Sequence, residues 1–294
     1  MKIVRNITVA SLGFLAFTAV HAQTVQNWMS PEVGNAWSQG YKGAGVTVTV
    51  IDDFKSSKYY IGKLGGYTQI DLHGNFTKQE ASLIAPLATL RTQDYYAGTA
   101  VGLNPGLNVL NLSYSMIARA GYAITQIGWN NQESSIIGHA KNGRAVVAKA
   151  AGNAGVVIGT PNAAGNVDYL GVALKGAASA IFVGALTTHG STAAPASLAS
   201  YSNRPGNDAV VQRQFLTVGV LGDKTGLNGT SFGAPIISGY SAILGSKFTQ
   251  STPTQIVNQL LNTARKDTIA GYNAATHGRG EASLTRALAP VSIQ

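Results

Sequence analysis

Val46-Thr47-Val48-Thr49-Val50-Ile51, followed directly by Asp52-Asp53, is the stretch from which we derive the fold. Its β-branched residues predict a buried strand. Similar short apolar runs, each bounded by glycine or asparagine, occur at 109–112, 145–148 and 180–183, and helical patterns occur at 79–90, 134–142, 234–248 and 254–264. Strands that alternate with helices predict an α/β fold of three layers, with a central mostly parallel sheet flanked by helices.

The length and composition are typical of one globular domain. The chain has 294 residues, of which 45% are apolar and 11% are charged, and this is enough to fill a single core. The absence of cysteine excludes disulfides, thiolate metal sites and cysteine nucleophiles. Since no linker-like change in composition divides the sequence, we expect one domain that spans residues 23–294.

The first 22 residues have the pattern of a secretory signal peptide. Lys2 and Arg5 precede an apolar run at 7–20, which ends in Val20-His21-Ala22, a small-x-small cleavage signal. A membrane anchor is the alternative, but the run is short for a span and contains serine, threonine and glycine. We therefore expect a secreted or periplasmic protein that does not remain inserted in a membrane after cleavage.

The charge distribution argues against a nucleic-acid binder. Removal of residues 1–22 leaves 19 basic and 12 acidic residues, a net charge of +7. These charges are dispersed, and the densest basic cluster is the pair Arg265-Lys266, whereas nucleic-acid binders gather lysine and arginine into a stripe.

Polar residues stand where the predicted strands end. Asp52-Asp53 follow the first run, Asn111 lies within the second, and Gly152-Asn153 come just after the third. In parallel sheets, functional residues collect at the carboxyl ends of the strands. A single carboxylate in such a place is more often a structural group or a helix cap, so its role depends on the residues around it.

Ser231 has two possible interpretations. Gly229-Thr230-Ser231-Phe232-Gly233 fits G-x-S-x-G, the nucleophile elbow of the α/β-hydrolases, in which Asp267 and His277 would complete the triad. That elbow requires a buried strand that runs directly into the turn, but residues 222–228 are polar and rich in glycine.

In the other interpretation Ser231 precedes the helix at 234–248, whose first turn contains Pro235. The helix dipole and the free N–H groups at this end would stabilise an oxyanion. His73, at the entry to a helix and followed by Gly74, is the candidate base, and Asp52 is the group that would orient it.

Together these residues make the chain resemble a subtilisin-like serine protease, a subtilase of the peptidase S8 family. Gly229-Thr230-Ser231-Phe232-Gly233-Ala234-Pro235 resembles the nucleophile motif GTSxAxP of that family. Other segments that resemble family motifs are Val50-Ile51-Asp52, His73-Gly74, Ala150-Ala151-Gly152-Asn153, Val109-Leu110-Asn111-Leu112-Ser113 and Tyr201-Ser202-Asn203-Arg204. The order Asp, His, Asn, Ser is also that of the family.

The resemblance implies a serine endopeptidase that hydrolyses peptide bonds in a protein or peptide substrate through an acyl-enzyme intermediate. It implies Asp52, His73 and Ser231 as the catalytic triad, and the Asn153 amide with the Ser231 N–H as the oxyanion hole. It also implies that the substrate lies along residues that flank two strand ends: Ser113, Tyr114, Ser115, Ala150, Ala151 and Gly152. The mechanism requires no cofactor, and although many subtilases bind structural calcium, no loop here has the spacing of a metal site.

Several positions depart from the family pattern. Asp53 and Phe54 follow the aspartate, Asn75 replaces a threonine, Ser115 replaces a glycine, and Lys149 lies in a strand where small apolar residues are expected. Lys149 must therefore reach solvent or find a partner. These departures support an alternative function, a catalytically impaired subtilase-like scaffold that acts as a binding protein. Since 29 residues separate Ala22 from Asp52, too few for a propeptide, a separate folding or inhibitory partner is a further expectation.

Overall fold

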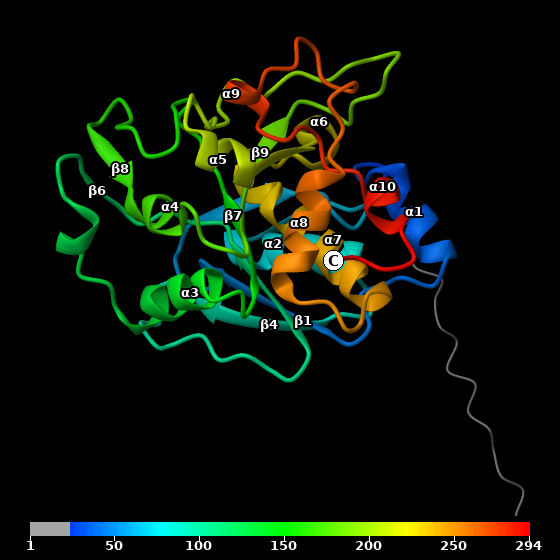
Figure 1. Cartoon of the computed structure of the whole chain (residues 1–294), viewed down its shortest axis with the longest axis horizontal. Helices are drawn as coiled ribbons and strands as arrows, with labels where there is room; N and C mark the ends of the chain where they lie inside the picture. The colour runs from blue at the N-terminus through cyan, green and yellow to red at the C-terminus, as the bar shows by residue number, and fades with distance from the viewer. Residues whose placement is uncertain (1–23) are drawn as a thin grey trace, which may run out of the picture.

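A computed structural model describes residues 24–294 (Figure 1). The strands are β1 (Val46–Asp52), β2 (Tyr59–Gly62), β3 (Gln69–Leu72), β4 (Thr89–Asp94), β5 (Leu107–Leu112), β6 (Ile117–Arg119), β7 (Val146–Ala150), β8 (Asn166–Asp168), β9 (Ala180–Leu186) and β10 (Phe215–Gly219). The α-helices are α1 (Pro31–Ser38), α2 (His73–Ile84), α3 (Asn131–Lys141), α4 (Tyr169–Leu174), α5 (Ala209–Gln214), α6 (Gly222–Thr225), α7 (Ala234–Lys247), α8 (Pro253–Asn262), α9 (Ala274–His277) and α10 (Leu284–Leu288). Two short 3-10 helices, η1 (Ile124–Gln126) and η2 (Thr230–Phe232), complete the elements.

One parallel sheet forms the centre of the molecule. Its strand order is β10-β9-β7-β5-β1-β4, and each neighbouring pair is parallel. All seven residues of β1 are buried, as expected for an interior strand with both faces covered. Two short antiparallel ribbons, β2 with β3 and β6 with β8, lie outside this sheet. The predicted α/β fold with a parallel sheet is confirmed.

Helices cover both faces of the sheet. On one face α2, α7 and α8 contact β1, β5 and β7, and on the other α3 and α5 contact β7 and β9, with α4 against α3. Each face has its own apolar cluster, because alternate residues of a strand point to opposite sides: Val50 belongs to one cluster and Ile51 to the other. The three layers predicted from the sequence are therefore present.

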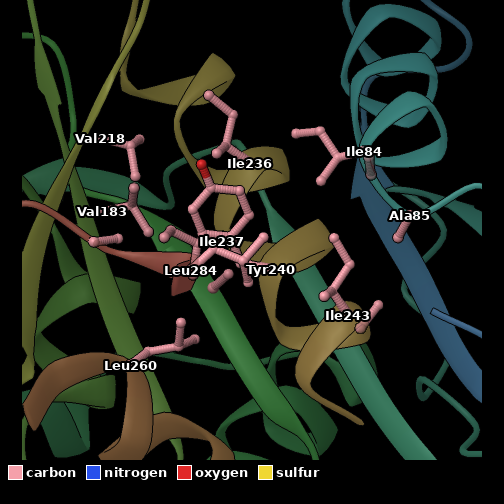
Figure 2. Packing of buried hydrophobic residues seen from close by; sticks show 14 of the residues in the cluster. Ile84, Ala85, Val183, Val218, Ile236, Ile237, Tyr240, Ile243, Leu260 and Leu284 are labelled. Carbon is pink, nitrogen blue, oxygen red and sulfur yellow. The ribbon is translucent and has the colours of Figure 1, made fainter. Parts of the chain in front are cut away.

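The helix α7 forms the middle of the larger cluster. Each of its residues from Ala234 to Gly245 is buried, which is typical of a helix that is apolar all round. Figure 2 shows its side chains between α2 on one side and strands of the sheet on the other. Gly239 lets α7 approach α2 closely, because a Cβ atom at this position would lie 2.5 Å from Cγ2 of Ile84. The helix that follows Ser231 is thereby fixed against the helix that begins at His73.

The structure corrects two boundaries that the sequence analysis placed. The helix expected at 79–90 begins earlier, at His73, and ends at Ile84, and residues 89–94 form the edge strand β4 instead. The sequence analysis also missed β10, at the opposite edge of the sheet. The residues of β4 are mostly polar and partly exposed, because an edge strand at this position faces solvent, and so they lack the apolar run that marks an interior strand.

Glu32 joins the first and last described helices. Its carboxylate accepts hydrogen bonds from the Ser283 hydroxyl at 3.0 Å and from the backbone N–H groups of Leu284 at 2.6 Å and Thr285 at 3.2 Å. These N–H groups belong to the first turn of α10, where no intrahelical acceptor exists. Figure 1 shows the result: α1, in blue, lies beside α10, in red.

The expected signal peptide at 1–22 lies outside the described residues. Within residues 24–294, none of the helices has the length and apolar character that a bilayer span requires.

We predict that Gly239→Ala lowers the free energy of unfolding by about 1–3 kcal/mol, because the added methyl group overpacks the contact between α7 and Ile84. Gly138→Ala on α3 is the matched control: no atom lies within 4 Å of its Cβ position, so the higher helix propensity of alanine should stabilise the protein by roughly 0.5–1 kcal/mol. Denaturant unfolding of both variants measures the difference. Changes of opposite sign are expected, and a Gly239→Ala protein as stable as the unaltered one would contradict the close approach.

Candidate active site

Parallel pairing brings the predicted site residues to one edge of the sheet. Asp52 is the last residue of β1, Ser113 follows β5, and Asn153 lies three residues after β7. These three strands are neighbours and run in the same direction, so their carboxyl ends meet. His73 begins α2, and Ser231 lies in η2. Both helices pack against the sheet, and they place these two side chains near the same carboxyl ends of the strands.

Asp52 and His73 form a short hydrogen bond. Asp52 is 1% exposed, and its Oδ1 lies 2.6 Å from His73 Nδ1. An ionised carboxylate only accepts hydrogen bonds, so Nδ1 carries the proton and Nε2 is left as the basic nitrogen. The carboxylate also accepts hydrogen bonds from the Asp53 N–H at 2.7 Å and from the Thr77 hydroxyl at 2.7 Å. The sequence analysis missed Thr77, although its spacing of four residues from His73 places both on one helix face.

Aromatic rings flank the His73 imidazole. The Tyr60 ring lies 5.2 Å from it and the Phe232 ring 5.3 Å, measured between ring centroids. Gly74 allows the approach of the chain on the Asp52 side, because a Cβ atom at this position would lie 2.7 Å from the Asp53 carbonyl oxygen. This close approach keeps the start of α2 against the end of β1.

Ser231 and Ser113 are joined by two reciprocal hydrogen bonds. The Ser231 hydroxyl donates to the Ser113 carbonyl at 3.2 Å, and the Ser113 hydroxyl donates to the Ser231 carbonyl at 2.8 Å. Among the described residues, no hydrogen bond joins the Ser231 hydroxyl to His73. The neighbouring residue Phe232 contacts the imidazole, so Ser231 lies in the turn adjacent to His73. In ligand-free sites, catalytic hydrogen bonds are often not yet formed.

Thr230 fixes the orientation of the Asn153 amide. The Asn153 Oδ1 accepts hydrogen bonds from the Thr230 N–H at 2.8 Å and from its hydroxyl at 2.9 Å. Because a backbone N–H requires an acceptor, the oxygen must face Thr230, and the Nδ2 group is left to donate elsewhere. Among the described residues, it has no hydrogen-bond partner. Next to it, Gly229 has a φ of 126°, a backbone conformation that favours glycine.

Asn203 supports the loop that carries Asn153. Its Oδ1 accepts from the N–H groups of Ala154 and Val156, both at 3.1 Å, and its Nδ2 donates to the Ala151 carbonyl at 2.9 Å. Gly152, with a φ of 107°, has no room for a side chain beside this amide. The sequence analysis named Asn203 within a motif but assigned it no role, because its contacts join segments about fifty residues apart.

The six residues expected to line the substrate cleft have different places. Ser115, Ala150, Ala151 and Gly152 line a cavity of about 100 Å³ that continues past Asn153. Ser113 instead contacts Ser231, and Tyr114 lies against the Tyr95 ring, with 5.7 Å between centroids. The structure therefore brings four of the six into one cavity.

Two of the unusual neighbours of Asp52 and His73, Asp53 and Asn75, have hydrogen-bond partners of their own. Burial raises the pKa of Asp53, but hydrogen bonds from Ser56 and from the Lys55 N–H outweigh this and hold the pKa below its usual value. Asn75 donates to Asp71 at 2.6 Å. The charge of Asp53 is thus stabilised within its own turn.

The residues of the α/β-hydrolase alternative are engaged elsewhere. His277 is buried in α9, where its ring stacks on Tyr272, and Asp267 forms an ion pair with Arg286 at 3.5 Å. The segment before Ser231 contains α6 and a loop and not a strand, so the turn is no nucleophile elbow.

Within residues 24–294, no group of three or more histidine, aspartate or glutamate side chains is arranged to hold a metal ion.

Comparison with known proteins identifies the family. Residues 87–281 match the subtilase family, Peptidase S8. The chain belongs to this family. Its members are serine-type peptidases, and this is the class in which the chain falls. Among curated proteins, no match is found.

Solved structures of subtilisin-like proteases share the fold at low sequence identity. The prenylagaramide maturation protease PagA is 20% identical, with 88% of this chain and 98% of that chain covered and a TM-score of 0.56. MycP1 from Mycobacterium smegmatis is 20% identical, with 87% and 82% covered and a TM-score of 0.52. A lanthipeptide protease is 16% identical, with 85% and 89% covered and a TM-score of 0.56.

Glu80 is a buried carboxyl group two turns after His73 in α2. It is 3% exposed, and its Oε2 has no hydrogen-bond partner among residues 24–294. Burial raises the pKa of Glu80 well above its usual value, so the folded protein favours the protonated form. Below the usual pKa the carboxyl group is protonated in both the folded and the unfolded chain, and the protein keeps its full free energy of unfolding. As the pH rises from the usual pKa toward the folded pKa, the unfolded chain ionises more readily, and the free energy of unfolding falls.

We predict that Glu80→Gln becomes more stable relative to the unaltered subtilase as the pH rises above about 4.5, since glutamine has no proton to lose. Thermal unfolding of both proteins from pH 4 to pH 8 measures the difference in melting temperature. A difference that stays constant across this range would show that Glu80 is not held protonated.

Proposed function

We propose that this subtilase is a serine endopeptidase in which Asp52, His73 and Ser231 form the catalytic triad and Asn153 contributes to the oxyanion hole. The observation that carries the proposal is the 2.6 Å hydrogen bond between Asp52 and His73 Nδ1, which makes Nε2 the ring nitrogen that is available to act as a base next to the turn that contains Ser231. The substrates are proteins or peptides, as for the family.

The first half of the reaction acylates Ser231. A rotation of its side chain moves the hydroxyl from the Ser113 carbonyl to His73 Nε2, which accepts the proton as the oxygen attacks the peptide carbonyl carbon. The negative charge moves to the carbonyl oxygen, where the Asn153 Nδ2 and the Ser231 N–H donate to it. His73 then gives its proton to the leaving amine, and the C–N bond breaks.

The second half releases the acid. Water loses a proton to His73 and attacks the ester carbonyl, and the proton returns to the Ser231 oxygen as the acyl bond breaks. Asp52 remains ionised throughout and stabilises the imidazolium. Its three hydrogen bonds hold the carboxylate in this orientation. The steps use only groups of the chain and water, so we propose that the reaction needs no cofactor.

A catalytically impaired scaffold is the second candidate function. It is favoured by one observation: the Ser231 hydroxyl donates to Ser113, with no hydrogen bond to His73 among the described residues. In such a protein the cleft would bind a peptide without cleaving it.

We also propose that residues 1–22 direct export and are removed before Gln23, from the basic and then apolar pattern of this segment. Mass spectrometry of the exported protein is expected to give an N-terminus at Gln23, and retention of Lys2 and Arg5 would contradict the proposal.

We predict that a fluorophosphonate probe labels the purified protein at Ser231, because the probe reacts with a serine that an adjacent base activates. Ser231→Ala should abolish labelling and casein hydrolysis. Asn153→Ala should retain the labelled serine but lower turnover by ~10²–10³-fold, the usual cost of one oxyanion donor.

Ser134→Ala is the matched control, since Ser134 is an exposed serine on α3, and this variant should be labelled like the unaltered protein. A folded protein that is not labelled would overturn the peptidase proposal and leave the binding scaffold. Labelling that persists in Ser231→Ala would place the nucleophile elsewhere.

A further inference from the structure

The cavity beside Asn153 is lined by an ion pair between a buried lysine and a partly buried aspartate. Lys149, on β7, is only 1% exposed, and its Nζ lies 2.8 Å from Oδ2 of Asp168. Asp168 ends β8, and the ribbon of β6 and β8 holds it over the sheet. Both side chains line the cavity. Lys149 therefore does not reach solvent, and it has the partner that its position in a buried strand demands.

One proton of the Lys149 ammonium makes only a long hydrogen bond, and Oδ2 of Asp168 can accept a further one. The Lys149 ammonium has three protons: it donates to Asp168 and to the Ala150 carbonyl at 2.7 Å, but its contact with the Ser115 hydroxyl is long, at 3.5 Å. On Asp168, Oδ1 accepts from the N–H groups of Met116 at 3.1 Å and Gly171 at 3.4 Å. Within the described part of the chain, Oδ2 accepts only from Lys149, and the Asp168 side chain is 18% exposed.

A substrate side chain next to the scissile bond would reach this pair. The Asn153 amide, which would hold the carbonyl oxygen, lies at the rim of the cavity, and the wall continues through Gly152, Ala151 and Ala150. The substrate residue that contributes this carbonyl group has its Cα bonded directly to the carbonyl carbon that is attacked. Its side chain is thus the one that can enter, and about 100 Å³ is room for several water molecules, or for a side chain of moderate size.

We propose that this cavity selects a glutamine or asparagine side chain on the acyl side of the scissile bond. A carboxamide carries an acceptor and a donor side by side, and these match the Lys149 proton that makes only the long contact with Ser115 and the second lone pair of Asp168 Oδ2. The proposal rests on the proposed function for the choice of the bond that is cut, and it adds a substrate class and two specificity-determining residues, Lys149 and Asp168.

Other side chains match the cavity less well. A long apolar side chain would displace water from two charged groups without replacing their hydrogen bonds. A lysine or glutamate would add a third charge to a pair that is already neutral overall. Sites built to hydrogen-bond their substrate discriminate strongly against analogues that lack the polar group.

The experiment measures peptide binding without catalysis. Ser231→Ala protein, full length after residue 22, is titrated by calorimetry with N-acetylated tetrapeptides that have three alanines and then Gln, Asn, Met, Glu or Lys as the C-terminal residue. Gln or Asn is expected to bind at least ten-fold more tightly than Met, which is close to Gln in shape. Equal affinity for Met, or tighter binding of Glu or Lys, would overturn the proposal, as would failure of all five peptides to bind.

A double variant tests the two residues. Lys149→Met alone would leave Asp168 without its partner, so we combine it with Asp168→Asn, which keeps an acceptor for the Met116 and Gly171 N–H groups. In the Ser231→Ala background this variant should bind Gln and Met within about three-fold of each other. Unchanged discrimination in a variant that melts cooperatively would show that the pair does not select the side chain.

The two proposals can fail separately. Fluorophosphonate labelling tests Ser231, and peptide binding by Ser231→Ala tests the cavity. A protein that is labelled but does not discriminate keeps the peptidase function and loses the inference. One that discriminates but is not labelled keeps the selective cavity on a binding scaffold.

Discussion

The parallel pairing of β1, β5 and β7 is the constraint on which the site depends. Because these three strands run in one direction, the turns that follow them meet at one edge, and Asp52, Ser113 and Asn153 are brought together from positions about a hundred residues apart. The register is tightly specified, since residues of β1 alternate between two apolar clusters and a shift by one residue would exchange the two faces. The geometry of the site is therefore a consequence of how the core packs.

Much of this arrangement could be predicted from the sequence, since it leaves local signals. Interior strands such as Val46–Asp52 are apolar runs, and residues such as Ser231 and His73 stand beside glycine and at helix starts. The edge strand β4 left no such signal, because one side of it faces solvent and its residues can be polar. Contacts between distant segments were also beyond sequence reasoning: nothing near Lys149 indicates that Asp168 lies beside it, or that Asn203 holds the loop of Asn153.

Lys149 and Glu80 show two ways in which this fold accommodates a buried ionisable group. Asp168 and the Ala150 carbonyl accept hydrogen bonds from the Lys149 ammonium. Glu80 forms no ion pair within residues 24–294, and burial raises its pKa and so favours its neutral form. Lys149 and Asp168 also line the cavity beside Asn153, so a ligand there can form hydrogen bonds with them, whereas Glu80 is not part of that lining.

The hydrogen bonds of Glu32 bear on the order in which the chain folds. They connect residues separated by 251 to 253 positions, so α1 cannot complete its contacts until α10 has been synthesised. Contacts of such long sequence separation slow folding, because a large loop must close before they form. We therefore expect α1 to dock against α10 only after synthesis of the chain is nearly complete, as one of the last steps of folding.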